Sequence, residues 1–404
     1  MIVLKVPDTH SGLGTFFKRG MFMNIVIVDD NITNLMIIEK ILQKAGYDQL
    51  VLLSSARELY DYLQLDASSS VEIPVDLILM DLMMPEIDGL EACRTILANE
   101  RYEDLPIIIV TAMGDSYKMA EAMDAGALDY VMKPINKVEL LARIRSVLRL
   151  KYEKDLRKER DRRIQHELDL AKQVQLSMLS DPIVQGDVTI SAVYKPSFEL
   201  AGDLYAWYQI SPGRYGVILL DMMGHGISSS LVCMYIYSTL KDAITGLGDP
   251  EAVMMELNRR MNQLHMPDRL ENYYFTAIYF VLDTSEQTIE YVNAGHPAGI
   301  AIVDDEVKLM ANGCCPLGFF EDIDVIKGVI PYKKGARILL FTDGLSEGLE
   351  EEYEDAISKL VSSLQEQGMD DPKELFERLQ LSSEMLQDAK DDMCLVMVST
   401  NGGA

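Results

Sequence analysis

Between residues 24 and about 150, the chain alternates short apolar runs with longer amphipathic stretches. The stretches repeat apolar residues at helical spacing, as in NLMIIEKILQKAG, which ends at a glycine. The apolar runs have the length of strands and read NIVIV (24–28), LVLLS (50–54), DLILM (76–80), PIIIV (106–110) and LDYVM (128–132). Five strands that alternate with helices predict an α/β domain with a parallel, doubly wound sheet over residues 24–147.

The next segment, from residue 136 to about 180, predicts one long helix without Gly or Pro until Pro182. It begins apolar and then becomes densely charged in KYEKDLRKERDRR, after which apolar residues resume at steps of three and four. That spacing suits a coiled-coil seam, but the polar middle is long, so a solvated rigid connector remains the alternative. We assign residues 148–181 to this helical linker.

From about residue 187 the pattern changes to longer β-rich segments. They read DVTISAVYKP, DLYAWYQI, YGVILL, YYFTAIYFVLD, TIEYVNA, ARILLFT and CLVMVS. Helical stretches lie between them at 228–247, 250–264 and 353–388. An α/β sandwich with strands at its centre is the architecture expected for residues 182–400.

Residues 1–23 form an N-terminal extension that fits no element. The stretch has no long apolar region followed by a cleavage site, so it does not read as a signal peptide. Start sites at Met1, Met21 or Met23 remain open, as does a disordered tail.

Net charge, cysteine spacing and the length of apolar runs disfavour nucleic-acid-binding and membrane-spanning proteins. The 37 basic and 64 acidic residues give a formal charge of −27, which disfavours nucleic acid as a partner because phosphates would be repelled. The cysteines show no CxxC spacing and suit reduced thiols, so a cytoplasmic protein is expected. No apolar run approaches the length of a membrane span. The five cysteines are Cys93, Cys233, Cys314, Cys315 and Cys394; packing explains the adjacent pair better than metal binding.

Polar residues follow the carboxyl ends of four of the five predicted strands. Asp29 and Asp30 follow the first, Asp81 the third, Thr111 the fourth and Lys133 the fifth. Such ends meet at one edge of a parallel sheet, where ligands bind. Crowded carboxylates repel one another and favour a divalent cation with oxygen ligands such as Mg²⁺. With that charge screened, Asp81 could attack a phosphoryl group, and Thr111 could hydrogen-bond the product.

The stretches VDDN, LMDLMMPEIDG, VTA and DYVMKP resemble the receiver domain of two-component response regulators. The resemblance implies a flavodoxin-like fold and phosphorylation of Asp81 by a sensor histidine kinase or phosphotransfer protein. It also implies that Asp29, Asp30 and the carbonyl of Met83 help to hold Mg²⁺. Tyr130 would reorient together with Thr111; without the resemblance, a half-buried strand aromatic would be the preferred interpretation.

Aspartates mark strand ends again in the second half of the chain. Asp221 and Asp343 follow apolar runs, whereas Asp203 and the Asp391–Asp392 pair come just before other apolar runs. Such carboxylates predict a site for a hard metal, Mg²⁺ or Mn²⁺ rather than zinc, since no Cys or His cluster has ligand spacing. Nearby glycines that permit tight backbone are Gly202, Gly224, Gly226 and Gly344. Four further residues are candidates with weaker support. His225 could be a ligand, since imidazole binds Mn²⁺, but a single histidine beside glycines is more often structural, and His296 is similarly ambiguous. Glu199 and Glu347 are interpreted as solvated loop residues.

The stretches ELAGDLY, DMMGHG, FTAIYF, NAGHPA, PLG, FTDGLSE and DDMCLVMV resemble the metal-dependent, PPM-type serine/threonine protein phosphatases of the bacterial sporulation and stress branch. The resemblance implies that Asp221 bridges two Mn²⁺ or Mg²⁺ ions with the carbonyl of Met222 beside it. Asp343 and Asp391 would bind the second ion, with Asp392 as an open alternative, and Asp203 would support the first. A water activated between two such ions attacks phosphorus in line.

These resemblances imply a response regulator that controls a phosphoserine/phosphothreonine phosphatase, with a phosphorylated anti-sigma-factor antagonist as substrate and a homodimer formed through the linker helix. One alternative is a phosphorylation-gated adaptor with a dead phosphatase-like domain, against which the retained carboxylates argue. Another is a transcription factor, for which no helix-turn-helix or basic face is found. Neither nucleic acid nor a membrane is expected as a partner.

Overall fold

The computed structural model describes residues 23–65, 73–112, 116–224, 226–264, 273–349, 353–365, 371–379 and 391–401. The N-terminal extension up to residue 22 lies outside these ranges. The chain divides into two compact units, residues 1–163 and 164–404. Within the described ranges, no helix has the length and apolar character needed to cross a membrane.

The first unit contains a five-stranded parallel sheet in the order β2-β1-β3-β4-β5. This order and the alternation with helices confirm the doubly wound, flavodoxin-like fold. Three strands run slightly further than the sequence pattern indicated, so Asp81 and Lys133 are the last residues of their strands. The strands are β1 (Asn24–Val28), β2 (Gln49–Leu53), β3 (Leu77–Asp81), β4 (Ile107–Ala112) and β5 (Asp129–Lys133).

Helices cover both faces of this sheet, and two apolar cores result, one on each face. Three of the helices are preceded by a capping residue whose side chain accepts hydrogen bonds from backbone N–H groups of the first turn. These caps are Asn31, Ser55 and Asp88. The helices before the linker are α2 (Ile32–Gln43), α3 (Ala56–Leu63), α4 (Gly89–Leu97) and α5 (Ser116–Asp124).

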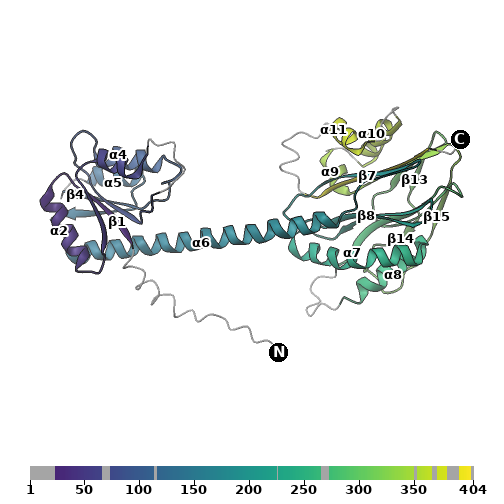
Figure 1. Ribbon diagram of the computed structural model, residues 1–404, viewed down its shortest axis with the longest axis horizontal. Helices are drawn as coiled ribbons and strands as arrows, with labels where there is room; N and C mark the ends of the chain where they lie inside the picture. Colours follow the sequence, from purple (N-terminus) through teal and green to yellow (C-terminus); the bar gives the residue numbers. More distant parts are fainter. Residues whose placement is uncertain are drawn as a thin grey trace. The chain divides into compact units, whose positions relative to one another are not determined.

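The predicted long helix is α6 (Lys137–Met178), 42 residues without a break (Figure 1). Its first turns contribute Leu140, Ile144 and Leu148 to the core of the first unit, whereas its charged middle is mostly exposed. Lys154 and Lys158, one turn apart, both form ion pairs with Asp104 in the loop before β4. The helix is therefore fixed to the first unit beyond the edge of its apolar core.

The second unit is a sandwich of two six-stranded sheets, as expected. One sheet has the order β14-β11-β10-β9-β8, with β15 beside β11, and the other β13-β12-β16-β17-β7-β6. The first comprises β8 (Asp203–Ser211), β9 (Arg214–Met222), β10 (Phe275–Asp283), β11 (Thr288–Ala294), β14 (Gly313–Cys314) and β15 (Gly328–Pro331). The second comprises β6 (Ile183–Gln185), β7 (Val188–Lys195), β12 (Gly299–Val303), β13 (Glu306–Met310), β16 (Gly335–Phe341) and β17 (Met393–Asn401).

Alternate residues of both sheets, among them Trp207, Phe280 and Val396, form the apolar core between them. The outer faces are covered by helices: α7 (Ile227–Leu247) and α8 (Pro250–Asn262) on the first sheet, and α9 (Asp343–Gly348), α10 (Tyr353–Gln365) and α11 (Pro372–Arg378) on the second (Figure 1). The helix predicted over 353–388 is thus α10 and α11, and residues 366–370 and 380–390 lie outside the described ranges.

Candidate functional site

The three carboxylates predicted at the edge of the parallel sheet lie together. Carboxylate oxygens of Asp29, Asp30 and Asp81 are all within 4.8 Å of one another, and no other group of this kind is found among the described residues. The reason is topological, because β1 and β3 are neighbours and end at the same edge. Lys133, at the end of β5, places Nζ 2.9 Å from Asp29 Oδ2 and 2.8 Å from Asp81 Oδ1.

The environment of Asp81 favours a cation. Burial raises the pKa of Asp81 above its ordinary range; the hydrogen bond from Lys133 lowers it, and the charges of Asp29 and Asp30 raise it again. Asp29 is oriented by the backbone N–H of Asn31 at 2.9 Å and the side-chain amide of Asn34 at 3.0 Å. Three crowded carboxylates paired with one lysine among the described residues fit an oxygen-ligated Mg²⁺.

The loop after Asp81 closes directly back onto it. Gly89 donates its N–H to Leu82 O at 2.9 Å, and a Cβ at Gly89 would lie 2.4 Å from the carbonyl oxygen of Asp81. Only glycine therefore permits this approach. Met83 lies in the loop with its side chain 59% exposed and its Sδ 3.4 Å from Lys118 Nζ.

The two predicted switch residues occupy adjacent strands. Thr111 is buried on β4, one residue beyond the partner of Asp81 in the β3–β4 register. Tyr130 is half-buried on β5, where the guanidinium of Arg143 lies 5.1 Å from the centre of its ring. The structure thus places Thr111 near the end of the strand next to β3, and an aromatic ring held beside a guanidinium on the following strand.

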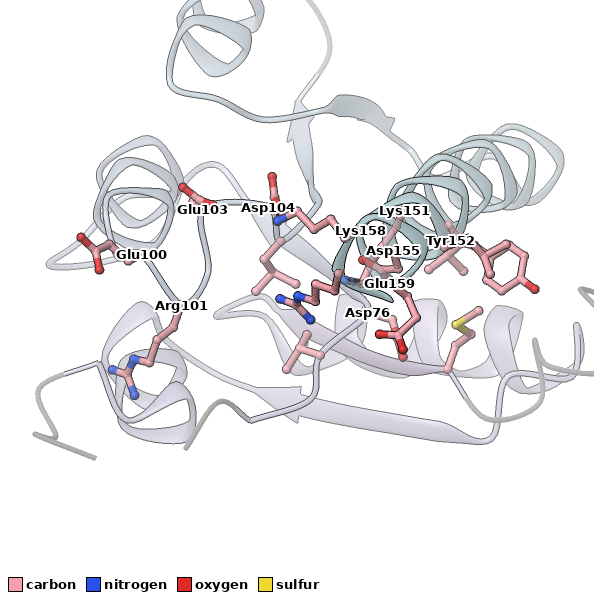
Figure 2. Close-up of a pocket in the computed structure, with 16 residues that line it drawn as sticks. Asp76, Glu100, Arg101, Glu103, Asp104, Lys151, Tyr152, Asp155, Lys158 and Glu159 are labelled. Carbon is pink, nitrogen blue, oxygen red and sulfur yellow. Dashed lines mark hydrogen bonds and ion pairs between the residues drawn. The ribbon is translucent and has the colours of Figure 1, made fainter. Parts of the chain in front are cut away.

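A groove of about 870 Å³ in the first unit lies away from these residues. Figure 2 shows that it is lined by charged side chains of α6 and of the loop that carries Asp104. Its lining also includes Met23 and Asp76, which precede β1 and β3. The groove therefore lies at the amino ends of the strands, whereas sites in such sheets lie at the carboxyl ends.

In the second unit, Asp203 and Asp221 face each other across β8 and β9 as register partners. Asp203 is 2% exposed, and its Oδ2 has no hydrogen-bond partner within the described part of the chain. Burial, followed by the charges of Asp221 and Asp392, raises the pKa of Asp203 well above its ordinary value. Burial and then the charge of Asp343 raise the pKa of Asp221 to about 7. A buried, unsatisfied carboxylate oxygen of this kind is explained by a cation.

The remaining carboxylates approach from β16, α9 and β17. A Cβ at Gly344 would lie 2.2 Å from the carbonyl oxygen of Asp392, so this glycine lets the start of α9 bring Asp343 against the 391–392 segment. Burial, and secondarily the charge of Glu347, raises the pKa of Asp343. The four candidate carboxylates influence one another electrostatically, although within the described residues they do not meet as tightly as the triad of the first unit.

Asp391 and Asp392 have different surroundings. Asp392 is 3% exposed and accepts hydrogen bonds from the N–H and hydroxyl of Ser197 and from the N–H of Gly202, at 2.7 to 2.9 Å. Both of its oxygens therefore hold the 197–202 loop. Asp391 is half-exposed, and we retain it as the candidate ligand.

The carbonyl of Met222 also faces this region. A Cβ at Gly202 would lie 3.1 Å from the carbonyl oxygens of both Met222 and Gly224, so the glycine lets β8 approach the loop after β9. The residues present, carboxylates with raised pKa values and nearby carbonyls, fit hard divalent cations.

Comparison with known proteins agrees with this geometry. Residues 25–145 match the family described as "Response regulator receiver domain", and residues 211–401 match "Stage II sporulation protein E (SpoIIE)". The chain thus joins a receiver domain to a domain of the SpoIIE family. The recognition made from the motifs is thereby confirmed.

Individual relatives cover one part of the chain or the other. The phosphoserine phosphatase RsbP of Bacillus subtilis is 42% identical over 44% of this chain and 45% of its own length. The response regulator ArlR of Staphylococcus aureus is 49% identical over 20% of this chain and 36% of its own length. The chain thus spans less than half the length of these curated relatives. The SiaA-PP2C domain of Pseudomonas aeruginosa aligns with a TM-score of 0.49 and 18% identity, covering 60% of this chain and 98% of that one.

Two histidines of the phosphatase domain were considered as ligands. His225 lies outside the described residues. His296 is buried, its Nδ1 is 2.8 Å from the hydroxyl of Thr276, and burial lowers its pKa to about 3. Its backbone N–H and carbonyl both bond to the side chain of Asn293, so its surroundings are those of a neutral, structural imidazole. Glu347 is exposed, and Glu199 is half-exposed with its Oε1 3.5 Å from the amide of Gln165.

Sequence patterns missed several residues around the phosphatase carboxylates. Thr276 is the register partner of Asp221 on β10, and the hydroxyl of Thr342 lowers the pKa of Asp203. Gln175 contacts the loop before Asp203 from α6. A polar residue inside an apolar strand was a signal for Thr276, whereas nothing local distinguishes Gln175 from Gln165 and Gln173 of the same helix.

The raised pKa of Asp221 makes metal binding dependent on pH. A carboxylate must lose its proton to bind a metal, so below pH 7 protons compete with the cation and affinity falls as pH falls. We expect the Mn²⁺ dissociation constant of the full chain to rise roughly tenfold for each pH unit below about 7. Titration calorimetry at pH 8 and pH 6 checks this, with the heat in buffers of different ionisation enthalpy giving the proton release. An affinity independent of pH would contradict the assignment of Asp221 as a ligand.

Proposed function

We propose that this chain is a metal-dependent protein serine/threonine phosphatase whose activity is controlled by phosphorylation of its receiver domain. The observation that carries the phosphatase proposal is the Asp203–Asp221 pair, in which Asp203 is buried and one of its oxygens lacks a hydrogen-bond partner among the described residues. Such a pair costs folding free energy unless a cation is bound. A domain that only bound a partner would have no chemical need for it, which argues against the adaptor alternative.

Each residue of the candidate metal site has a distinct proposed role. Asp221 and the carbonyl of Met222 would hold metal ions together with Asp343 and Asp391, and Asp203 would support them from the buried side. Two divalent ions there, Mn²⁺ or Mg²⁺, supply an activated water and neutralise charge on the phosphoryl group. Asp392 positions the loop that carries Gly202 and Asp203 through its three hydrogen bonds. Thr276, beside Asp221 in the sheet, helps to shape the wall of the site.

In the receiver domain, Asp81 would accept a phosphoryl group from a sensor histidine kinase or a phosphotransfer protein. Asp29, Asp30 and the carbonyl of Met83 would hold Mg²⁺, and Lys133 would neutralise an oxygen of the bound phosphate. Loss of the Lys133–Asp81 ion pair on phosphorylation frees the lysine for that contact. Thr111 and Tyr130 would then reorient and so alter the surface of the receiver domain.

For the substrate, the proposal is a phosphoserine or phosphothreonine on an anti-sigma-factor antagonist protein. It is supported by the sequence similarity of the phosphatase domain to a protein named as a phosphoserine phosphatase. The chain's charge of −27 is compatible with a protein substrate and unfavourable for nucleic acid.

Hydrolysis of p-nitrophenyl phosphate by the full chain tests the enzymatic proposal. We expect turnover with Mn²⁺ and none with EDTA, and we expect Mn²⁺ added in excess to restore it. A protein that binds Mn²⁺ at the phosphatase domain but hydrolyses neither this compound nor a phosphoserine peptide would support the adaptor alternative instead.

The linker helix contacts the loop that precedes the candidate ligand Asp203. Gln175 of α6 is 3% exposed; its Nε2 donates to Ala201 O at 2.8 Å, and its Oε1 accepts from Ala201 N–H at 3.1 Å. The next residue, Gly202, bonds Asp392, and Asp203 follows it. A shift or rotation of α6 would therefore move this loop or break two buried hydrogen bonds.

We propose that phosphorylation changes the pairing of two linker helices in a homodimer and so activates the phosphatase. The helix carries apolar side chains 42% to 53% exposed that a second helix could cover: Leu150, Leu156, Ile164, Leu170, Val174 and Leu176. The phosphorylated state can shift such an equilibrium only by its differential stabilisation of one arrangement.

A proline pair in the helix tests this coupling. The double variant Arg160→Pro/Asp161→Pro breaks helical hydrogen bonds in an exposed stretch of α6, so we expect hydrolysis to become indifferent to acetyl phosphate. The matched control Arg160→Ala/Asp161→Ala preserves the helix and should respond as the wild type does. If the proline variant also responds like the wild type, α6 is a passive spacer.

A further inference from the structure

Exposed aromatic side chains cluster beside the carboxylate-bearing end of β9. Phe319 and Phe320 are 55% and 54% exposed, and their rings meet edge to face with centroids 4.9 Å apart. Phe319 also meets the half-buried ring of Tyr274 edge to face at 5.4 Å. These three residues are called the aromatic platform below. Exposed apolar groups gathered in this way mark interaction surfaces more often than isolated ones do.

The platform is held by a buried side chain. Asn258 on α8 is 2% exposed; its amide donates to the carbonyls of Phe320 and Glu321, both at 3.0 Å, and its Oδ1 accepts from Gly318 N–H at 2.7 Å. Gly318 has a φ of +88°, and a Cβ there would lie 2.3 Å from Met261 Cγ. The loop is thus fixed in a conformation that keeps both phenylalanines exposed.

The platform is continuous with the candidate active site. Phe275 and Leu317 exchange two backbone hydrogen bonds, which places the 317–320 segment along the start of β10. Met223, two residues after Asp221, donates its N–H to the carbonyl of Tyr274 at 3.0 Å. Tyr274 is two residues from the register partner of Asp221, about 7 Å along the strand. A chain segment bound on the platform would therefore reach the carboxylates.

Charge defines what the platform can bind. Three exposed acidic residues follow the phenylalanines directly: Glu321, Asp322 and Asp324. A phosphoprotein approaching this strongly acidic chain is repelled unless basic side chains accompany its phosphate. Aromatic anchors beside an acidic run complement a segment that carries both apolar and basic residues.

We propose that the aromatic platform docks the substrate protein next to its phosphorylated residue and selects phosphoserine segments flanked by apolar and basic side chains. This inference rests on the proposed phosphatase function and specifies its substrate class. Phe319 and Phe320 supply apolar contact area, and the acidic run supplies the preference for Arg or Lys. Neither acts on the phosphorus itself.

Two phosphoserine peptides of equal length test the proposal, one with Leu and Arg flanking the phosphoserine and one with Gly and Glu. We expect the Mn²⁺-loaded full chain to favour the first by on the order of tenfold in kcat/KM, mainly through KM. Phe319→Ser/Phe320→Ser should lower the ratio of the two values toward one. The ratio is informative because general damage to the metal centre affects both peptides. Glu321→Gln/Asp322→Asn leaves the aromatic rings in place and should reduce the preference for Arg. The control Val184→Ser, which also replaces an exposed apolar side chain by Ser but on β6, should leave the ratio unchanged.

The outcomes separate the two proposals. If the wild type hydrolyses p-nitrophenyl phosphate but treats the peptides alike, or if both variants keep the wild-type ratio, the platform proposal is wrong. If the phenylalanine variant instead converts a dimer to a monomer in sedimentation with the ratio unchanged, the platform is a self-association surface and the proposal is equally wrong. If the wild type hydrolyses no phosphoester with Mn²⁺, the proposed function itself fails, and the platform proposal with it.

Discussion

Replacing Asp221 by Asn is expected to lower Mn²⁺-dependent hydrolysis of p-nitrophenyl phosphate by more than about 100-fold. Asp221 lies opposite Asp203 and is influenced by Asp343 and Asp391, so it is the carboxylate best placed to contact metal from several sides. The amide keeps the shape of the side chain but removes the charge that a cation requires. Steady-state kinetics at saturating Mn²⁺ measure the effect.

A stability measurement distinguishes this loss from misfolding. Because the pKa of Asp221 is raised, its ionised form costs the metal-free folded state free energy at pH values above about 7. The Asn variant has no such cost, so without metal we expect it to unfold at a higher temperature than the wild type at pH 8. Mn²⁺ should then stabilise the wild type more than the variant. Asp187→Asn, the same chemical change at an exposed loop position, should alter neither activity nor stability. Full activity in the Asp221 variant would refute its role as a ligand.

Replacing Asp81 by Asn is expected to abolish labelling of the chain by acetyl phosphate in the presence of Mg²⁺. Asp81 has the two neighbouring carboxylates and the lysine that the reaction needs, with Lys133 Nζ 2.8 Å from its Oδ1. The product on the wild type should be an acyl phosphate that is stable in acid and labile in base. Labelled phosphate retained on the denatured protein, followed by base treatment, measures it.

The comparison of the two variants tests whether the sites are separate. Asp81→Asn should retain basal Mn²⁺-dependent hydrolysis, and Asp221→Asn should retain labelling at Asp81, because the carboxylates belong to different compact units. Asp48→Asn, at an exposed position of the receiver domain, serves as the control. Undiminished labelling of the Asp81 variant would overturn the assignment of the phosphorylation site, and loss of both activities in one variant would indicate misfolding or a shared site.

Much of the fold followed from local patterns. The five apolar runs and the helical spacing between them identified the parallel sheet, since strands buried on both faces read as continuous apolar segments. The long helix followed from the absence of Gly and Pro between residues 136 and 181. The pattern missed β6, β12, β13, β14 and β15, because short or mixed strands have no strong period and are stabilised by the strands beside them.

The sequence by itself determined which carboxylates to consider, because an aspartate that ends an apolar strand is costly and therefore informative. Only the tertiary structure shows that Asp391 and Asp392 have different surroundings, since the donors that bond to Asp392 come from Ser197 and Gly202, about 190 residues earlier. The same is true of the Gln175–Ala201 bonds and of the aromatic platform, whose exposure depends on Asn258. Apolar periodicity is a local property of the chain, whereas burial and hydrogen bonding of a single polar side chain depend on contacts that form only when distant segments pack together.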